Sequence, residues 1–126
     1  AMRQGKGFVT VERYTDLRGL SVDAPYGAIL LECLCNLTAN EMFSPDGAGA
    51  DAYQAILDGV ERLEALCETL IVVTNDVGSD GGGYDAATMR YVETLGRLNA
   101  ALAARFDCVA ELIAGIPLVR KGALPI

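Results

Sequence analysis

Continuous apolar runs alternate with amphipathic stretches along this chain. The runs over residues 28–34 and 69–74 have the composition of strands that are covered on both faces. Hydrophobic residues recur at helical spacing over residues 50–68, and again from residue 86 to about residue 106. The other expected elements are a strand over residues 8–14, a helix over 36–43, a strand over 108–114 and an edge strand over 118–120. This alternation predicts an α/β fold, with a mostly parallel sheet and helices on both faces, in a single domain over residues 1–126.

Local signals mark the breaks between these elements. Residues 16–20 are expected to form a turn or a helical turn, and Asp85 is the expected N-cap of the helix that begins at residue 86. Residues 115–117 (Gly-Ile-Pro) are expected to break the last strand. The side chains expected to be buried on the two long helices are Tyr53, Ile56, Leu57, Val60, Leu63 and Leu66 or Cys67, and then Tyr91, Val92, Leu95, Leu98, Leu102 and Phe106.

Composition narrows the classes of function. The net charge is −7 and the ten Lys and Arg residues are scattered, which argues against nucleic-acid binding along a basic face. No apolar run is long enough to span a bilayer, and no basic segment followed by an apolar one marks a signal peptide. The four cysteines are expected to be free, mostly buried thiols of a cytoplasmic protein. Because the chain has no histidine, it cannot hold Ser/His/Asp or Cys/His catalytic machinery, and no metal site is predicted.

Polar residues stand at the ends of the two apolar runs, where ligands bind in open α/β sheets. Glu32 interrupts the first run, and Thr74, Asn75 and Asp76 end the second. A carboxylate in an apolar run is costly to bury unpaired, so Glu32 either serves a nucleotide site, pairs with an arginine or caps the following helix. The other three residues either line a crevice or form an ordinary polar turn. We expect both strand ends to share one nucleotide site.

The glycine-rich stretch over residues 78–83 is not expected to bind phosphate. It has neither the G-x-x-x-x-G-K-[ST] spacing nor the G-x-G-x-x-G spacing of phosphate-binding loops. It also contains Asp80, whose charge would repel a phosphate. The stretch is therefore interpreted as a connecting loop or a lid.

Several segments together resemble one family, the bifunctional adenosylcobinamide kinase / adenosylcobinamide-phosphate guanylyltransferases of cobalamin (vitamin B12) biosynthesis. They occur in the family's order and cover nearly the whole chain. The segments are Thr10-Val11-Glu12, Ala28-Ile29-Leu30-Leu31-Glu32-Cys33 with Thr38 and Asn40, Val73-Thr74-Asn75-Asp76-Val77-Gly78, Gly96-Arg97-Leu98-Asn99, Ala101-Leu102-Ala103-Ala104-Arg105, and Gly115-Ile116-Pro117-Leu118 with Lys121-Gly122.

The resemblance implies a P-loop NTPase-like (RecA-like) fold, usually assembled as a homo-oligomer. It implies a transferase with two reactions: phosphorylation of the adenosylcobinamide hydroxyl by GTP or ATP with Mg²⁺, and transfer of GMP from GTP through a guanylylated histidine. It also implies that Glu12 and Glu32 contact the guanine nucleotide, because they match the glutamates of two family segments. A carboxylate can accept the paired N–H donors of guanine or the ribose hydroxyls. Thr74, Asn75 and Asp76 would line the same crevice.

The chain also departs from the family pattern. Family members open with a strand, a glycine-rich loop ending in Gly-Lys-Ser, a helix and then the nucleophilic histidine, and this sequence contains neither that loop nor any histidine. We therefore place no catalytic residue in this chain, which is truncated relative to the family and expected to be inactive alone. Three interpretations remain: a fragment of a family enzyme, a short paralogue that binds nucleotide or corrinoid without catalysis, or a subunit whose sheet another chain completes. Because the P-loop strand is central in such sheets, residues 28–33 and 70–74 would otherwise flank a gap with unpaired backbone groups, which is costly. We predict that this gap is filled by rearrangement, by a partner or by residues outside this sequence.

Overall fold

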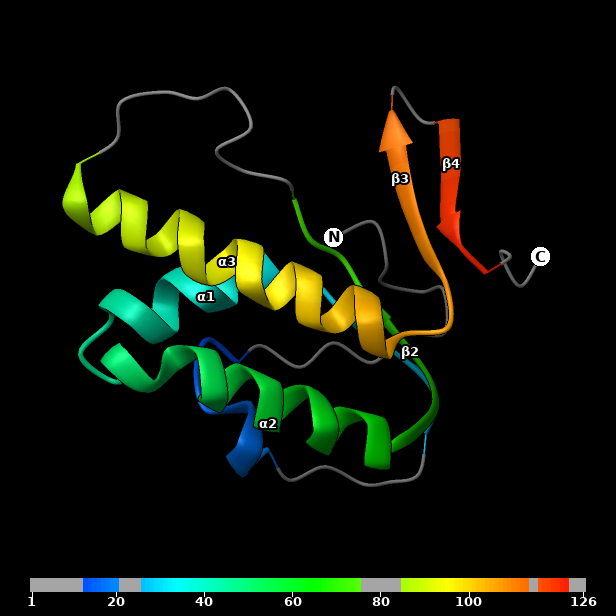
Figure 1. Cartoon of the computed structure of the whole chain (residues 1–126). Helices are drawn as coiled ribbons and strands as arrows, with labels where there is room; N and C mark the ends of the chain where they lie inside the picture. The colour runs from blue at the N-terminus through cyan, green and yellow to red at the C-terminus, as the bar shows by residue number, and fades with distance from the viewer. Residues whose placement is uncertain (1–12, 21–25, 76–84, 114–115, 123–126) are drawn as a thin grey trace. The chain divides into compact units, whose positions relative to one another are not determined.

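The computed structural model describes residues 13–20, 26–75, 85–113 and 116–122 (Figure 1). The chain divides into two compact units, Ala1–Val73 and Thr74–Ile126. The first unit contains the 3-10 turn η1 (Leu17–Gly19), β1 (Tyr26–Leu31), α1 (Leu34–Phe43), the 3-10 turn η2 (Gly49–Asp51), α2 (Ala52–Ala65) and β2 (Cys67–Val72). The second unit contains α3 (Ala86–Arg105), β3 (Val109–Ile113) and β4 (Ile116–Lys121). The predicted α/β class is confirmed.

Strands β1 and β2 pair directly and in parallel, with Tyr26 opposite Cys67 and Leu31 opposite Val72. The chain between them forms α1, η2 and α2, which is the long crossover that a parallel pair requires. The structure therefore leaves no gap between these two runs, because their backbone groups bond to one another, which is the rearranged pairing among the predicted alternatives. The expectation of a mostly parallel sheet is also too broad, since β3 and β4 form a separate antiparallel pair within the described residues.

The strands β1 and β2 are less covered than their composition predicts. None of their residues is buried, and the Ile71 side chain is 50% exposed. In the described part of the chain each of these strands has only the other as its neighbour in the sheet. The burial of a strand depends on what packs against it, so an apolar run alone does not show that the strand is buried.

The core of the first unit lies between its helices. Helical spacing brings Ile56, Val60 and Leu63 of α2 into the interior, where Leu34 and Leu37 of α1 are also buried. This confirms the predicted apolar face of α2, although its outer members Tyr53 and Leu57 are only half-buried.

The predicted helical turn over residues 16–20 is confirmed as η1, which packs against α2. Leu17 is buried there. A Cβ atom added to Gly59 of α2 would stand only 2.6 Å from the Leu17 Cβ atom. Gly59 therefore allows a close approach between the turn and the helix, which no larger residue would permit without movement.

Among the boundaries that differ from the predicted ones, two lie where an apolar run passes from strand to helix or back. β1 ends at Leu31 and α1 begins at Leu34, so the last residue of the first run belongs to the helix. α2 ends at Ala65, before its predicted end, because Cys67 already begins β2. Periodicity does not distinguish a strand from the first turn of a buried helix in such a run.

Helix α3 of the second unit begins as predicted. The Asp85 side chain accepts the Thr88 N–H over 2.7 Å, which confirms the N-cap. Leu95, Leu98 and Leu102 are buried, as their spacing predicts. The other predicted members of that face are only half-buried: Tyr91, Val92 and Phe106.

The predicted break at residues 115–117 is wrong for its last two residues, because β4 begins at Ile116. Pro117 lies opposite Leu112 in the antiparallel pair, and a proline is tolerated in an edge strand. At the other end of β4, the Lys121 ammonium donates to the carbonyl oxygens of Ala103 and Ala104 over 2.9 and 3.0 Å. This places a positive charge on the last turn of α3, where the helix dipole favours it.

Candidate functional site

Two backbone hydrogen bonds of Val73 join the carboxyl ends of β1 and β2. Its N–H donates to the Leu31 carbonyl oxygen over 3.0 Å, and its carbonyl oxygen accepts the Leu34 N–H over 2.8 Å. In sequence, these bonds stand on either side of Glu32 and Cys33. The structure therefore shows that the ends of the two apolar runs meet, with Glu32 in the connection between β1 and α1.

Glu32 itself is exposed. The sequence suggests a cost for burying this carboxylate, but an exposed carboxylate incurs no such cost. Cys33, the next residue, is extended at the N-cap of α1, with φ −126° and ψ 156°. An exposed carboxylate just beyond a pair of parallel strands is in the part of an α/β sheet where ligands bind.

In the second unit, Thr74 and Asn75 are fixed by Asn99 of α3. The Thr74 hydroxyl donates to Asn99 Oδ1 over 2.7 Å, and Asn99 Nδ2 donates to the Asn75 carbonyl oxygen over 3.2 Å. Thr74 and Asn75 are exposed, and Asn99 is half-buried. Two of the three residues predicted to line a crevice are therefore held by one amide side chain, while Asp76 lies outside the described residues.

No role is predicted for Asn99 from the sequence, although the position of this amide on α3 indicates one. It follows Leu95 by four positions and precedes Leu102 by three, so it belongs to the apolar face of α3. An amide on such a face calls for a hydrogen-bond partner. Its partners are more than twenty residues earlier in the chain, which no local pattern reveals.

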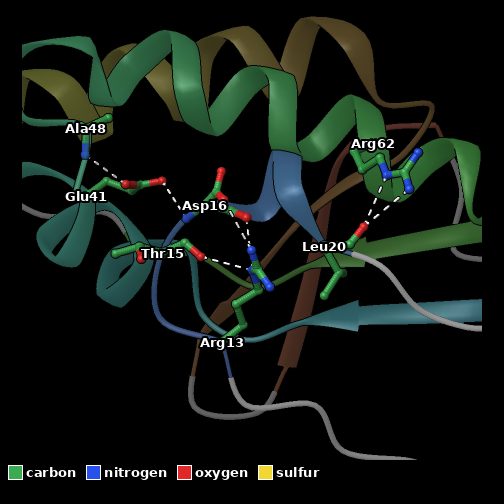
Figure 2. Close-up of polar contacts among 7 residues, drawn as sticks. All are labelled: Arg13, Thr15, Asp16, Leu20, Glu41, Ala48 and Arg62. Atoms are coloured by element: carbon green, nitrogen blue, oxygen red, sulfur yellow. Dashed lines mark hydrogen bonds and ion pairs between the residues drawn. The ribbon is translucent and has the colours of Figure 1, made fainter. Parts of the chain in front are cut away.

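Glu41 of α1 is a buried carboxylate that joins two other segments of the first unit (Figure 2). Its side chain is among the buried polar groups, with 2% of the residue exposed. One oxygen, Oε2, accepts the Asp16 N–H over 3.1 Å, and the other, Oε1, accepts the Ala48 N–H over 3.0 Å. Both carboxylate oxygens are therefore satisfied by backbone donors, as a buried charge requires.

Arg13 holds the same segment from its other side (Figure 2). Its Nε donates to the carbonyl oxygens of Thr15 and Asp16 over 3.1 and 2.9 Å, and its Nη2 lies 3.3 Å from Asp16 Oδ2. Asp16 has a φ of 58°, in the left-handed region that non-glycine residues seldom adopt. The bonds from Arg13 and Glu41 stabilise this conformation. Since Arg13 follows Glu12 directly, the network fixes the chain just after that predicted nucleotide contact.

A second anchor holds the end of this segment against α2. The Arg62 guanidinium donates to the Leu20 carbonyl oxygen through Nε and Nη2, each over 3.3 Å. Figure 2 shows this pair at the far end of the turn from Glu41. Contacts to α1 and α2 thus position residues 13–20.

An open cavity of ≈ 710 Å³ lies beside this network. Its volume is within the range of small-molecule sites. Glu32 is not among the residues that line it, so the cavity and the strand ends are separate features of the first unit. The lining residues are Arg13, Tyr14, Thr15, Asp16, Asn40, Ser44 and Asp46.

Some predicted features are outside the part that the structure describes: Glu12, Asp76, residues 8–12 of the first predicted strand and the glycine-rich stretch over residues 78–83. Among the described residues, no group of three or more His, Cys, Asp or Glu side chains is arranged to hold a metal ion. No helix in the described ranges is long and apolar enough to cross a membrane.

The four cysteines are free thiols, but only Cys35 is buried, so the expectation of mostly buried thiols is wrong.

Comparison with known proteins assigns this chain to a family. Residues 1–119 match the family described as cobinamide kinase / cobinamide phosphate guanyltransferase. The chain belongs to this family. The matched range spans the segments that contain Glu12, Glu32 and residues 74–76, and it confirms the predicted family resemblance, while the roles of these residues stay predictions.

Two curated relatives of the cobinamide kinase family agree with this assignment. One is the bifunctional adenosylcobalamin biosynthesis protein CobU of Salmonella typhimurium, which is 32% identical over an alignment of 104 residues that covers 74% of this chain and 58% of the relative. The other is the bifunctional adenosylcobalamin biosynthesis protein CobP of Pseudomonas aeruginosa, 30% identical over 94 residues, which are 75% of this chain and 53% of the relative. The chain thus spans a little over half the length of the curated relatives it matches.

Proposed function

We propose that this protein serves adenosylcobalamin biosynthesis as part of a cobinamide kinase and cobinamide-phosphate guanylyltransferase, and that its own residues bind the guanine nucleotide. The observation that carries the proposal is the family match over residues 1–119, with Glu32 exposed at the joined carboxyl ends of β1 and β2. The names of both curated relatives support a bifunctional biosynthetic protein. They do not favour the alternative of a non-catalytic partner subunit.

The proposed fold around this site is that of a P-loop NTPase, in which a parallel sheet presents nucleotide-binding groups at its carboxyl edge. The parallel pairing of β1 and β2 with its helical crossover supports a sheet of this kind, whereas their direct contact leaves no place for a P-loop strand between them. Neither the Gly-Lys-Ser loop nor a histidine is in this sequence, so its main contribution is nucleotide recognition, and it supplies neither the principal phosphate anchor nor the nucleophile. Assembly with further copies of the chain is part of the same proposal.

Glu32 supplies the recognition chemistry. A carboxylate has two acceptor oxygens, and guanine offers two adjacent donors, N1–H and the exocyclic amino group. Acceptance of these donors by the carboxylates of Glu32 and Glu12 would select guanine over adenine, because adenine lacks this donor pair. Thr74, Asn75 and Asp76, which follow Val73 in the chain, complete the proposed lining. Mg²⁺ enters with the triphosphate as part of the substrate.

A calorimetric titration of the chain with GTP, ITP and ATP, each with Mg²⁺, tests the proposal. GTP is expected to bind about tenfold more tightly than ITP, which lacks the exocyclic amino group, because one hydrogen bond to a charged acceptor is lost. ATP is expected to bind more weakly still, since it presents no matching donor pair. Equal affinity for all three nucleotides would contradict guanine recognition by these carboxylates.

A further inference from the structure

The hydrogen bonds of Asn99 fix the direction in which the Thr74 hydroxyl donates. The Asn75 carbonyl oxygen is only an acceptor, so the group of Asn99 that lies 3.2 Å from it must be the donating amide nitrogen. The amide oxygen therefore faces Thr74, over 2.7 Å. An amide oxygen is only an acceptor, so the single hydroxyl hydrogen of Thr74 is committed to Asn99.

A hydroxyl whose hydrogen is committed has only lone pairs left to offer. Thr74 is exposed, so those lone pairs are accessible to a ligand. They can accept a hydrogen bond, but they would repel a phosphate oxygen, which also brings lone pairs. Without Asn99, the Thr74 hydroxyl could bond either to a hydrogen-bond donor or to an acceptor such as a phosphate oxygen. With its hydrogen held by Asn99, it can bond to a donor but not to a phosphate oxygen.

We propose that Thr74 recognises a hydrogen-bond donor on the nucleoside part of the nucleotide, and that Asn99 is the positioning residue that sets this polarity. The inference rests on the proposed function, because it takes the nucleotide as the ligand of the residues after β2. The donors available on guanosine are the ribose hydroxyls and the N–H groups of the base. The same geometry leaves Thr74 no hydrogen to donate to a triphosphate oxygen.

The test compares GTP, 2′,3′-dideoxy-GTP, ITP and inorganic tripolyphosphate, all with Mg²⁺, on the wild-type chain and on Thr74→Val and Thr74→Ser. Valine keeps the shape of threonine and removes the hydroxyl, whereas serine keeps the hydroxyl. Thr74→Val is expected to weaken GTP binding about fivefold to tenfold, Thr74→Ser is expected to restore it to within about twofold, and tripolyphosphate binding is expected to stay unchanged. If the donor is a ribose hydroxyl, the loss disappears with dideoxy-GTP; if it is the exocyclic amino group, the loss disappears with ITP.

Two variants of Asn99 distinguish its effect on the direction of the Thr74 hydrogen bond from its role in holding the Asn75 backbone. Asn99→Asp still accepts from Thr74 but faces the Asn75 carbonyl oxygen with a second acceptor, so Asn75 is released while the Thr74 polarity is kept. This variant is expected to retain the preference of Thr74 for a donor, measured as the same loss of GTP affinity, about fivefold to tenfold, when Thr74→Val is added to it. Asn99→Leu frees the Thr74 hydroxyl hydrogen and is expected to raise tripolyphosphate affinity about twofold to fivefold.

The outcomes distinguish this inference from the function on which it rests. If Thr74→Val weakens tripolyphosphate binding, or if it leaves GTP binding unchanged, the inference is overturned while nucleotide binding stands. If the wild-type chain binds none of the four compounds, the proposed function fails, and the inference fails with it. A melting curve of each variant establishes that the compared proteins are folded.

Discussion

The buried carboxylate of Glu41 accepts the backbone N–H of Asp16 over 3.1 Å, while its other oxygen accepts the N–H of Ala48 over 3.0 Å. Few side chains can replace it, because two acceptors are needed on opposite sides of one group. An amide has one acceptor and one donor, so glutamine would direct an NH₂ group at a backbone N–H.

Glu41→Gln is accordingly expected to reduce the free energy of unfolding by about 1–3 kcal/mol, the cost of one unsatisfied buried donor. Glu93→Gln, the same change on an exposed residue of α3, is the matched control and should alter stability by less than about 0.5 kcal/mol. Urea denaturation of the two variants provides the comparison. Equal stability of both variants would show that the Glu41 bonds contribute nothing.

Two glycines on helices have opposite surroundings and give opposite predictions. A Cβ atom at Gly59 would lie 2.6 Å from the Leu17 Cβ atom, whereas at Gly96 nothing lies within 4 Å. Gly96→Ala should stabilise the protein by about 0.5–1 kcal/mol, because alanine is the better helix former. Gly59→Ala gains the same propensity but forces η1 away from α2, and a net loss of about 1–2 kcal/mol is expected.

The pair Gly59→Ala and Leu17→Gly tests that interpretation by thermal or chemical denaturation, because only glycine removes the Cβ atom at residue 17 that lies 2.6 Å from the added one. If the clash with Leu17 causes the loss, the double variant should be more stable than the sum of the two single changes predicts. Strict additivity would mean that the close approach of Leu17 is not the cause.

The N-cap of α3 should respond to acid. The hydrogen bond from the Thr88 backbone N–H lowers the pKa of Asp85 below its ordinary value of 3.8, with a further contribution from the Thr88 side chain. Because the folded pKa lies below the unfolded one, ionised Asp85 stabilises the folded chain above pH 3.8, and this contribution is lost as the pH falls through the folded pKa.

Asp85→Asn keeps a capping oxygen that does not titrate. The difference in stability between the wild-type chain and Asp85→Asn, followed by circular dichroism from pH 6 to pH 2, should therefore shift in favour of asparagine below about pH 4. A difference that stays constant over this range would contradict the assigned cap.

The sequence predicts the helices of this chain well because their signals are local. Leu95, Leu98 and Leu102 follow the helical period, and Asp85 stands where an N-cap should. The meeting of the two strand ends is also predictable, since parallel strands present their carboxyl ends at one edge.

The failures concern relationships between distant parts of the chain. The sequence does not predict which strand lies beside β1, because the family topology implied by the resemblance places another strand between β1 and β2, whereas the two pair directly. Glu41 and Asn99 were not singled out as anchors, since their partners are decided by how α1 and α3 lie against other segments. Pro117 is typical of a break in a strand, yet an edge strand accepts it opposite Leu112.

The affinity of Glu32→Ala for GTP is the most direct measurement of the central claim, that this exposed carboxylate at the end of β1 recognises the guanine nucleotide. Glu68→Ala, which removes an exposed glutamate from β2, is the matched control. Calorimetry should show GTP binding at least about tenfold weaker for Glu32→Ala, from the loss of hydrogen bonds to a charged acceptor, and an unchanged affinity for Glu68→Ala. Equal GTP affinity of Glu32→Ala and the wild-type chain would remove Glu32 from the site and contradict the account.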